Sequence, residues 1–521
     1  MLRLVRSVKN TFAAINQIPP EVFSLIPDYW QDRHTGQDLI TLSHVCRGWR
    51  EIFTSRSSLW TYLDCADADK TRVYVERSRS LPLEIFLRKS QRISYCDDAL
   101  PLVVPHISRL SSLTVCVRPN ILLDLLNQLP FPAPLLTELK IILDPESPDP
   151  DPIIPDTLFP GHLSPLRKLS LSGVFTRLPW RNLSDLTMFE FRYIPQTVDP
   201  LFVAQLLDFF ESTPLLNRIS LHDSIPISFS VPPGRVVPLL HLEELIVHSL
   251  PSHSTFLGHL SIPAASLVDL NLISFTDSAP IPACFANNFS NLYHITTIHL
   301  FLNGLPYKRM RLMGPNGDLR IFGSWANRNC SPLAAEHQFF RSLRKFDLSK
   351  TQRLAVEKYS SPGRGIEKYS FSPGRGIEES PIFQTLLLMK SLRTLLLIEV
   401  HNLSFIRALN PKQNKSHTVL CPELEELVLY VKRRDWFCLK ELMEMASERT
   451  KNVPKLSSIT IVSLDGICSK EEVFRLRRYV SHVEYKLDEE PPYWGAVYDA
   501  SEWDELRLHS EDEDDDWLEN Y

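Results

Sequence analysis

The chain has 521 residues, of which 44% are apolar and 23% are charged, a composition that supports a large buried core and excludes an intrinsically disordered chain. No stretch reaches the roughly eighteen consecutive apolar residues that cross a bilayer, so we expect no membrane partner. The net charge of −6 is uneven, because residues 488–521 hold fourteen acidic residues and one basic residue. The rest is only mildly basic and lacks a Lys/Arg cluster interleaved with aromatic residues, which predicts no nucleic-acid partner.

Residues 1–17 form a basic N-terminal segment in which Arg3, Arg6 and Lys9 alternate with apolar residues, and no acidic residue precedes Glu21. The segment lacks the apolar centre of a secretion signal, so we expect a cytoplasmic or nuclear protein. A mitochondrial transit peptide would show the same pattern and stays open as an alternative. Nine cysteines are scattered without a CxxC pair, which predicts reduced, mostly buried thiols rather than zinc ligands or disulfides.

Residues 18–62 carry a short helical pattern with an apolar stripe. Pro19 and Pro20 suit the first turn of a helix, whose amides have no internal partner. Further along, five residues fall at helical spacing on one stripe: Leu39, Leu42, Val45, Cys46 and Trp49. A segment of this length cannot bury the whole stripe internally, so part of it should meet a partner.

The segment resembles an F-box. The matching elements are Ile18-Pro19-Pro20-Glu21-Val22, Asp38-Leu39, Val45-Cys46-Arg47-Gly48-Trp49-Arg50 and Leu59-Trp60. The sequence departs from the family pattern between Ile26 and Asp38, where extra residues follow Pro27 and predict a loop. The resemblance implies binding to a Skp-type adaptor of a cullin-RING ubiquitin ligase through these residues: Ile18, Pro19, Pro20, Val22, Ile26, Leu39, Leu42, Val45, Cys46, Trp49 and Trp60. A small helical cap over the next domain is the structural alternative.

Residues 63–487 contain a connector and then a degenerate repeat. The segment after Asp69 resembles the connector of F-box-like proteins expanded in fungi. From Leu110 onward the pattern apolar-x-x-apolar-x-apolar occurs thirteen times, with starts 20 to 49 residues apart. The matches begin at Leu110, Leu136, Leu166, Leu186, Leu216, Leu242, Leu267, Ile295, Leu343, Leu392, Leu424, Leu456 and Val480.

The last two apolar positions of each match are two residues apart, as a strand with one buried face requires. Segments with helical spacing lie between them, including residues 98–109 and a run from Phe202 that ends before Pro214. The alternation predicts an α/β fold with a parallel sheet. It resembles a leucine-rich repeat, which implies an irregular solenoid behind the F-box helices.

Two insertions interrupt this pattern. Residues 144–160 are rich in Pro and Asp, and residues 351–380 contain two near-identical copies of EKYSSPGRGI in tandem, at 357–366 and 367–377. Both are predicted to be exposed loops. Neither copy has the glycine spacing of a phosphate-binding loop.

The sequence gives no sign of an enzyme. None of the HExxH, GxSxG, Walker lysine or kinase motifs occurs, and the sixteen histidines are dispersed, so we expect no cofactor and no metal. An unrecognised hydrolase or transferase is the least favoured reading. The favoured one is a substrate receptor of a ubiquitin ligase, and the alternative is a solenoid scaffold with no ligase role.

The outward strand positions change character along the repeats. Early ones are polar, as at Lys168 and Ser170, whereas late ones are apolar and form the predicted site for an unknown protein target: Leu396, Ile398, Val428, Tyr430 and Val462. The acidic tail, 488–521, includes three tryptophans and could compete for this patch. A simply solvated tail is the other reading.

Overall fold

The computed structural model describes most of the chain from residue 14 to residue 487, with gaps. The described residues are 14–23, 37–89, 96–129, 132–143, 153–154, 165–173, 175–176, 183–192, 202–225, 230–232, 234–251, 255–263, 266–273, 295–301, 307–314, 318–324, 340, 343–344, 346–357, 381–398, 402–413, 419–431, 438–451, 453, 456–463 and 470–487. None of the helices within these ranges has the length and apolarity to cross a bilayer.

The chain divides into two units. The first comprises the described residues up to Asp199 together with Gln205–Ser220, and the second comprises Pro200–Ala204 and the described residues from Leu221 onward. The division falls within α8 (Phe202–Ser212) and β9 (Arg218–His222). Helix α8 confirms the predicted run that ends before Pro214.

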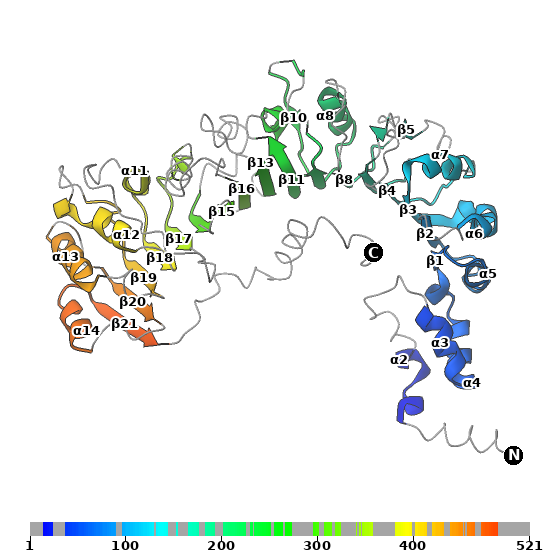
Figure 1. The fold of residues 1–521 in the computed structure, drawn as a ribbon, viewed down its shortest axis with the longest axis horizontal. Helices are drawn as coiled ribbons and strands as arrows, with labels where there is room; N and C mark the ends of the chain where they lie inside the picture. Colours follow the sequence, from blue (N-terminus) through cyan, green and yellow to red (C-terminus); the bar gives the residue numbers. More distant parts are fainter. Residues whose placement is uncertain are drawn as a thin grey trace. The chain divides into compact units, whose positions relative to one another are not determined.

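The first unit begins with short helices and continues into a parallel sheet (Figure 1). Its helices are η1 (Ala14–Gln17), α2 (Pro20–Phe23), α3 (Gln37–Val45), α4 (Arg47–Ser55), η4 (Ser57–Trp60), α5 (Ala68–Arg77), α6 (Cys96–Val103), η5 (Val104–Arg109) and α7 (Pro119–Asn127). Its strands are β1 (Tyr62–Asp64), β2 (Leu83–Lys89), β3 (Leu110–Val117), β4 (Glu138–Leu143), β5 (Ile153–Ile154), β6 (Lys168–Ser172), β7 (Phe175–Thr176) and β8 (Met188–Arg192).

The sheet of the first unit starts earlier than the repeat pattern suggested. Strands β1, β2, β3, β4, β6 and β8 pair in that order, all parallel. β1 follows the N-terminal helices directly, and β2 lies in the connector, where Leu83, Ile85 and Leu87 alternate with outward residues and are buried. The connector is therefore part of the sheet.

The second unit contains the longer run of strands. Its strands are β10 (Val237–Pro238), β11 (Glu244–Pro251), β12 (Leu260–Ser261), β13 (Leu267–Ile273), β14 (Thr297–Phe301), β15 (Tyr307–Met313), β16 (Asp318–Ser324), β17 (Arg353–Glu357), β18 (Thr394–Ile398), β19 (Glu426–Val431), β20 (Ser458–Ser463) and β21 (His482–Leu487). Its helices are η7 (Phe256–His259), α11 (Pro381–Leu388), α12 (Asn402–Leu409), η10 (Pro411–Gln413), α13 (Leu439–Arg449) and α14 (Lys470–Leu476).

A three-stranded meander interrupts the parallel order of the second unit. β13 pairs with β16 in parallel, whereas β15 is antiparallel to both β16 and β14, and β14 then pairs with β17 in parallel. From β17 the parallel order continues through β18, β19 and β20 to β21. The mixed α/β class with N-terminal helices and a many-stranded parallel sheet is confirmed, but β15 and β16 were not predicted.

The repeat pattern corresponds to an in-register stack. Leu354, Leu395, Leu427, Ile459 and Val483 are direct partners across β17 to β21, and all five are buried. One residue before several of the strands, a carbonyl accepts two amides of the next repeat, as Thr137 O does from Arg167 N and Lys168 N at 2.8 and 2.9 Å. The unequal lengths between repeats are therefore absorbed outside the strands.

Two of the thirteen matches were placed wrongly. In β13 the buried partners of Leu245 and Val247 are Val268 and Leu270, so the strand is aligned two residues away from the assignment that began at Leu267. The match at Leu343, Phe346 and Leu348 is buried, but none of these residues lies in a strand. The spacing of apolar residues predicts which residues are buried, but it does not distinguish a buried strand from a buried segment outside a strand.

The strand that replaces this second match lies in the predicted insertion 351–380. β17 has Leu354, Ala355 and Val356 buried, and Glu357, the first residue of the tandem copies, belongs to it. Residues 353–357 are thus part of the sheet, contrary to the prediction, because β17 pairs with β14 on one side and with β18 on the other. Residues 358–380 lie outside the described residues. So does most of 144–160, apart from β5, which pairs with β7 in parallel.

Arg449 holds one turn of the second unit together. Its side chain is 2% exposed, and Nη1 and Nη2 donate to the carbonyl oxygens of Leu420 and Cys421 at 2.7 and 2.8 Å. Cys421 sits in the left-handed region, at φ 48°, and burial raises the pKa of its thiol to about 12. Cys65 and Cys421 are buried, whereas Cys46, Cys116 and Cys438 are half-buried.

Arg449→Met should leave both carbonyls buried without a donor and destabilise this turn by about 3 kcal/mol. The buried Cys421 thiol reacts only when the turn opens. Its alkylation at pH 8 should therefore be roughly a hundredfold faster in the Arg449→Met variant than in the wild type. The control is Arg475→Met on α14, which removes only an exposed ion pair with Glu471 and should leave the rate unchanged. Equal rates in both variants would contradict the assigned role of Arg449.

Candidate functional site

The predicted apolar stripe from Leu39 to Trp49 is divided between two helices, α3 and α4. Cys46 has extended backbone angles, ends the run of α3 and caps α4, with its Sγ accepting from Trp49 N at 3.5 Å. Arg50 Nε donates to the Ser43 carbonyl at 2.9 Å and ties α4 back to α3. The residues from Leu39 to Trp49 therefore lie on two packed helices, because the backbone cannot continue as a helix through Cys46.

Several predicted adaptor contacts form an accessible apolar set. Val22 on α2 and Val45 on α3 are 53% and 54% exposed. Ile18, Leu39, Leu42, Cys46 and Trp49 are half-buried, and Pro19 is exposed. Pro20 begins α2, as predicted, while Ile26 lies outside the described residues. Ile15, which the sequence analysis did not name, is also 45% exposed.

Trp60 is the exception among the predicted contacts. It is 0% exposed, its Nε1 donates to the Phe53 carbonyl at 2.9 Å, and its ring meets Tyr74 of α5 edge to face at a centroid distance of 4.9 Å. The Arg77 guanidinium lies 4.3 Å from the centroid of the same ring. A fully buried side chain cannot touch a partner, so Trp60 instead anchors the helices to the connector.

The predicted target residues lie together on one face of the second unit. Leu396 pairs with Val428, Ile398 with Tyr430, and Tyr430 with Val462 in successive strands. With Ala355 they form a cluster, here called the apolar cluster. Its side chains are less accessible than expected: Leu396, Ile398, Tyr430 and Val462 are 1%, 5%, 8% and 3% exposed, and Val428 is half-buried. These residues lie together, as predicted, but they are buried, whereas the prediction was an exposed patch.

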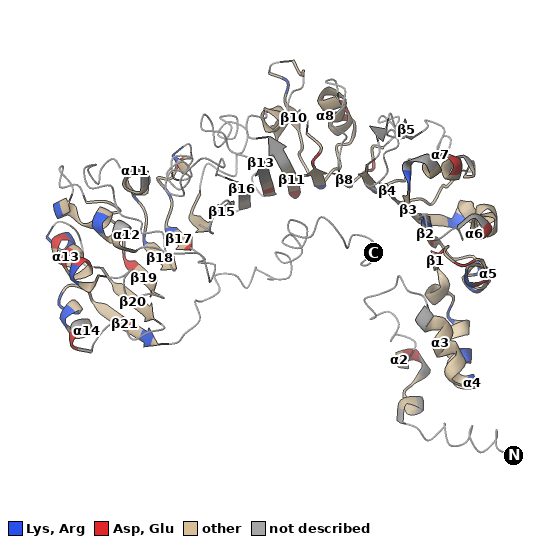
Figure 2. Ribbon diagram, viewed as in Figure 1, with Lys and Arg blue, Asp and Glu red and all other residues tan. Residues whose placement is uncertain are grey.

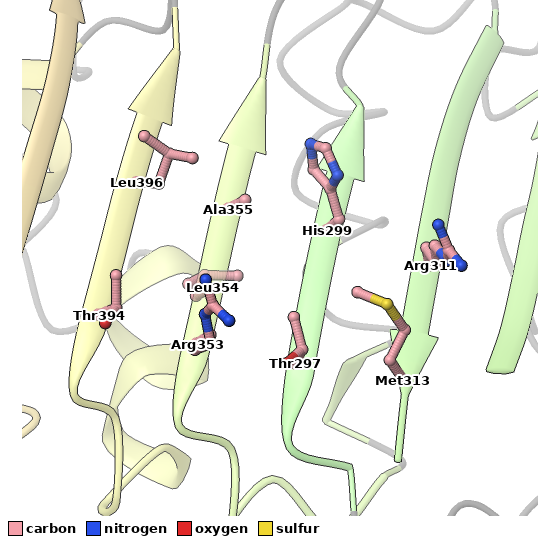
Figure 3. Close-up of a pocket in the computed structure, with 9 residues that line it drawn as sticks. All are labelled: Thr297, His299, Arg311, Met313, Arg353, Leu354, Ala355, Thr394 and Leu396. Atoms are coloured by element: carbon pink, nitrogen blue, oxygen red, sulfur yellow. The ribbon is translucent and has the colours of Figure 1, made fainter. Parts of the chain in front are cut away.

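A small pocket adjoins the apolar cluster (Figure 3). It is lined from four neighbouring strands by Thr297, His299, Arg311, Met313, Arg353, Leu354, Ala355, Thr394 and Leu396. His299 and Arg311 are 7% and 9% exposed, and His299 Nε2 lies 3.3 Å from Glu357 Oε2. Burial lowers the pKa of the Arg353 guanidinium, and the Glu426 carboxylate opposes that shift. Sequence reasoning missed this pocket, because β15 and β17 were not recognised as strands.

The charged residues of the helices form a different environment. Acidic and basic residues are interspersed over α13 and α14 (Figure 2). They form solvated pairs there, such as Lys451–Glu448 at 2.7 Å. Within the described ranges, no group of three His, Cys, Asp or Glu side chains is arranged to hold a metal ion.

Comparison with known proteins adds one match. Residues 15–66 match the family described as F-box-like, a span that runs from η1 through β1. The predicted boundaries, 18–62, fall inside it. No match was found among curated proteins.

Trp60→Ala should cost about 3 to 5 kcal/mol, because it removes a buried aromatic side chain between η4 and α5. Hydrogen exchange in α5 should rise accordingly. Val45→Asp, at an exposed position, should leave that exchange at the wild-type level. Unchanged exchange in the Trp60 variant would contradict the anchoring role.

Proposed function

We propose that this protein, which carries an F-box-like domain at residues 15–66, is a substrate-recognition subunit of an SCF-type cullin-RING ubiquitin ligase. In this proposal the N-terminal helices bind a Skp-family adaptor, and the stacked repeats form a leucine-rich-repeat-like solenoid that binds a protein target. Such a role places the protein in the cytoplasm or the nucleus. It requires neither a catalytic residue nor a cofactor.

The observation that carries the proposal is the exposed apolar set on the helices that match the family. Val22 and Val45 are more than half exposed, and Trp49 is only half-buried. Accessible aromatic and aliphatic side chains are the usual components of a binding hot spot. Trp60 is buried and holds α4 and η4 against the connector, through its hydrogen bond to Phe53 and its ring contact with Tyr74.

A fixed connection between the helices and the sheet would give the ligase a defined geometry. Trp60 bridges Phe53 of α4 and Tyr74 of α5, and β1 follows η4 directly. The adaptor surface is thereby joined to the first strands without a long linker.

The second candidate is a protein-interaction scaffold with no ligase role. The same Trp60 anchor favours it, since helices packed at the first strand also suit a terminal cap of a stacked-repeat protein. A cap needs its inner face only and gains nothing from the exposed Val22 and Val45. Adaptor binding therefore separates the two candidates.

Val45→Asp should abolish retention of a Skp-family adaptor in a pull-down, because it places a charge in an apolar interface. Trp49→Ala should weaken binding by about 2 kcal/mol, or roughly thirtyfold. Leu240→Asp, the same kind of change at an apolar residue 75% exposed in the second unit, should bind as the wild type does. Wild-type retention by both N-terminal variants would refute the adaptor role.

A further inference from the structure

β21 is the last strand of the second unit and lies at the end of its run of strands (Figure 1). Among the described strands it pairs with β20 alone, in parallel. His482 N donates to Ser457 O at 2.9 Å, so the backbone of His482 faces β20. Consecutive residues of a strand turn their amides and carbonyls toward opposite edges. The backbone groups of Val483 and Leu487 therefore face the outer edge of β21.

A side chain already donates to this outer edge. Arg477, an exposed residue of the turn before β21, donates from Nη2 to the Val483 carbonyl at 3.3 Å. The contact confirms that the Val483 carbonyl points away from β20. An exposed guanidinium is readily replaced by another donor, and a row of backbone groups along an edge is a template for a further strand.

The last repeat also lacks a polar outer surface. Leu487 at the end of β21 and Phe474 on α14 are 55% and 65% exposed. Val473 and Leu476 of the same helix are 8% and 0% exposed, so α14 is packed against the sheet without Phe474. The terminal repeats of stacked-repeat proteins usually carry a polar outer face. This repeat instead resembles an inner one, which has a neighbour on each side.

A second copy of β21 fits the outer edge best in one register. In a symmetric antiparallel pair, residues whose backbone faces the edge lie opposite one another. Centred on Tyr485, the pair sets Val483 opposite Leu487 and Glu484 opposite Lys486 of the second copy. Centred on Glu484 or on Lys486, it sets like charges opposite each other. Opposite charges across a strand pair stabilise it and like charges destabilise it, so charge selects the register centred on Tyr485.

We infer that the outer edge of β21 is a self-association site, and that its occupant is the β21 strand of a second copy of this chain, antiparallel and centred on Tyr485. Glu484 and Lys486 lie 3.6 Å apart within one strand, so the pair builds a square of four alternating charges. Residues 488–521, which lie outside the described residues, follow the two strands at opposite ends. Their negative charges therefore enter the pair from separate places.

This association does not depend on the ligase role. Under the proposed function, a dimer carries two adaptor-binding segments. One short strand from each copy gives an interface below the standard size, so we expect a weak dimer, with a dissociation constant of roughly 10 to 100 µM.

The test is sedimentation equilibrium of the full chain between about 1 and 200 µM. The wild type should show a reversible monomer–dimer equilibrium. Glu484→Lys sets two positive charges opposite each other at both ends of the pair, and Lys486→Glu sets two negative charges there. Each substitution should weaken the dimer by roughly tenfold or more. An equimolar mixture of the two variants restores opposite charges at both ends and should dimerise as the wild type does.

The control is Glu423→Lys, the same change of charge before β19 at a side chain 53% exposed, which should leave the dissociation constant unchanged. Recovery in the mixture also excludes misfolding as the cause of the loss. Three results would overturn the proposal. They are a wild type that stays monomeric throughout, as it would if residues 488–521 covered the edge, a dimer that neither substitution weakens, and variants that stay apart when mixed. Adaptor pull-down is measured separately, so failure of either proposal is recognised.

Discussion

In-register pairing of parallel strands is the constraint on which the rest of this structure depends. From β17 to β21 the buried row that begins at Leu354 continues from strand to strand, and the carbonyls just before β17, β18 and β19 each accept two amides from the following repeat. Because side chains alternate across a strand, this register aligns every buried row and every outward row at once. Both the core and the apolar cluster follow from it, whatever the length of chain between strands.

Side chains of several kinds satisfy backbone carbonyls near the starts of the strands. The Ser111 and Thr137 hydroxyls donate to the carbonyls of Leu83 and Ser111 at 2.9 and 3.1 Å. Elsewhere the donor is a guanidinium. Arg109 donates to the carbonyls of Val75 and Leu81 at the end of α5, and Arg449 donates to those of Leu420 and Cys421. Buried carbonyls need donors, and several residue types can supply them.

The N-terminal apolar set and the pocket arise in different ways. At the N-terminus, short helices leave apolar side chains outside because two or three turns cannot enclose them. In the second unit, the pocket adjoins the apolar cluster, because the antiparallel meander brings Arg311 beside His299 and so beside β17. The meander thus builds the pocket as well as interrupting the repeat.

The sequence by itself determined the local features of this protein: the helical N-terminal motif, the strands of most repeats, and the gathering of Leu396, Val428 and Tyr430 on one face. These depend on spacing along the chain, which the period of a helix or strand converts directly into a shared side. Only the tertiary structure decided that Trp60 points inward, that the strand after residue 350 is β17 rather than the segment at Leu343, and that β15 and β16 separate β13 from β14. Each of these depends on partners distant in sequence, and an apolar residue looks the same in the sequence whether it contacts a partner or the core.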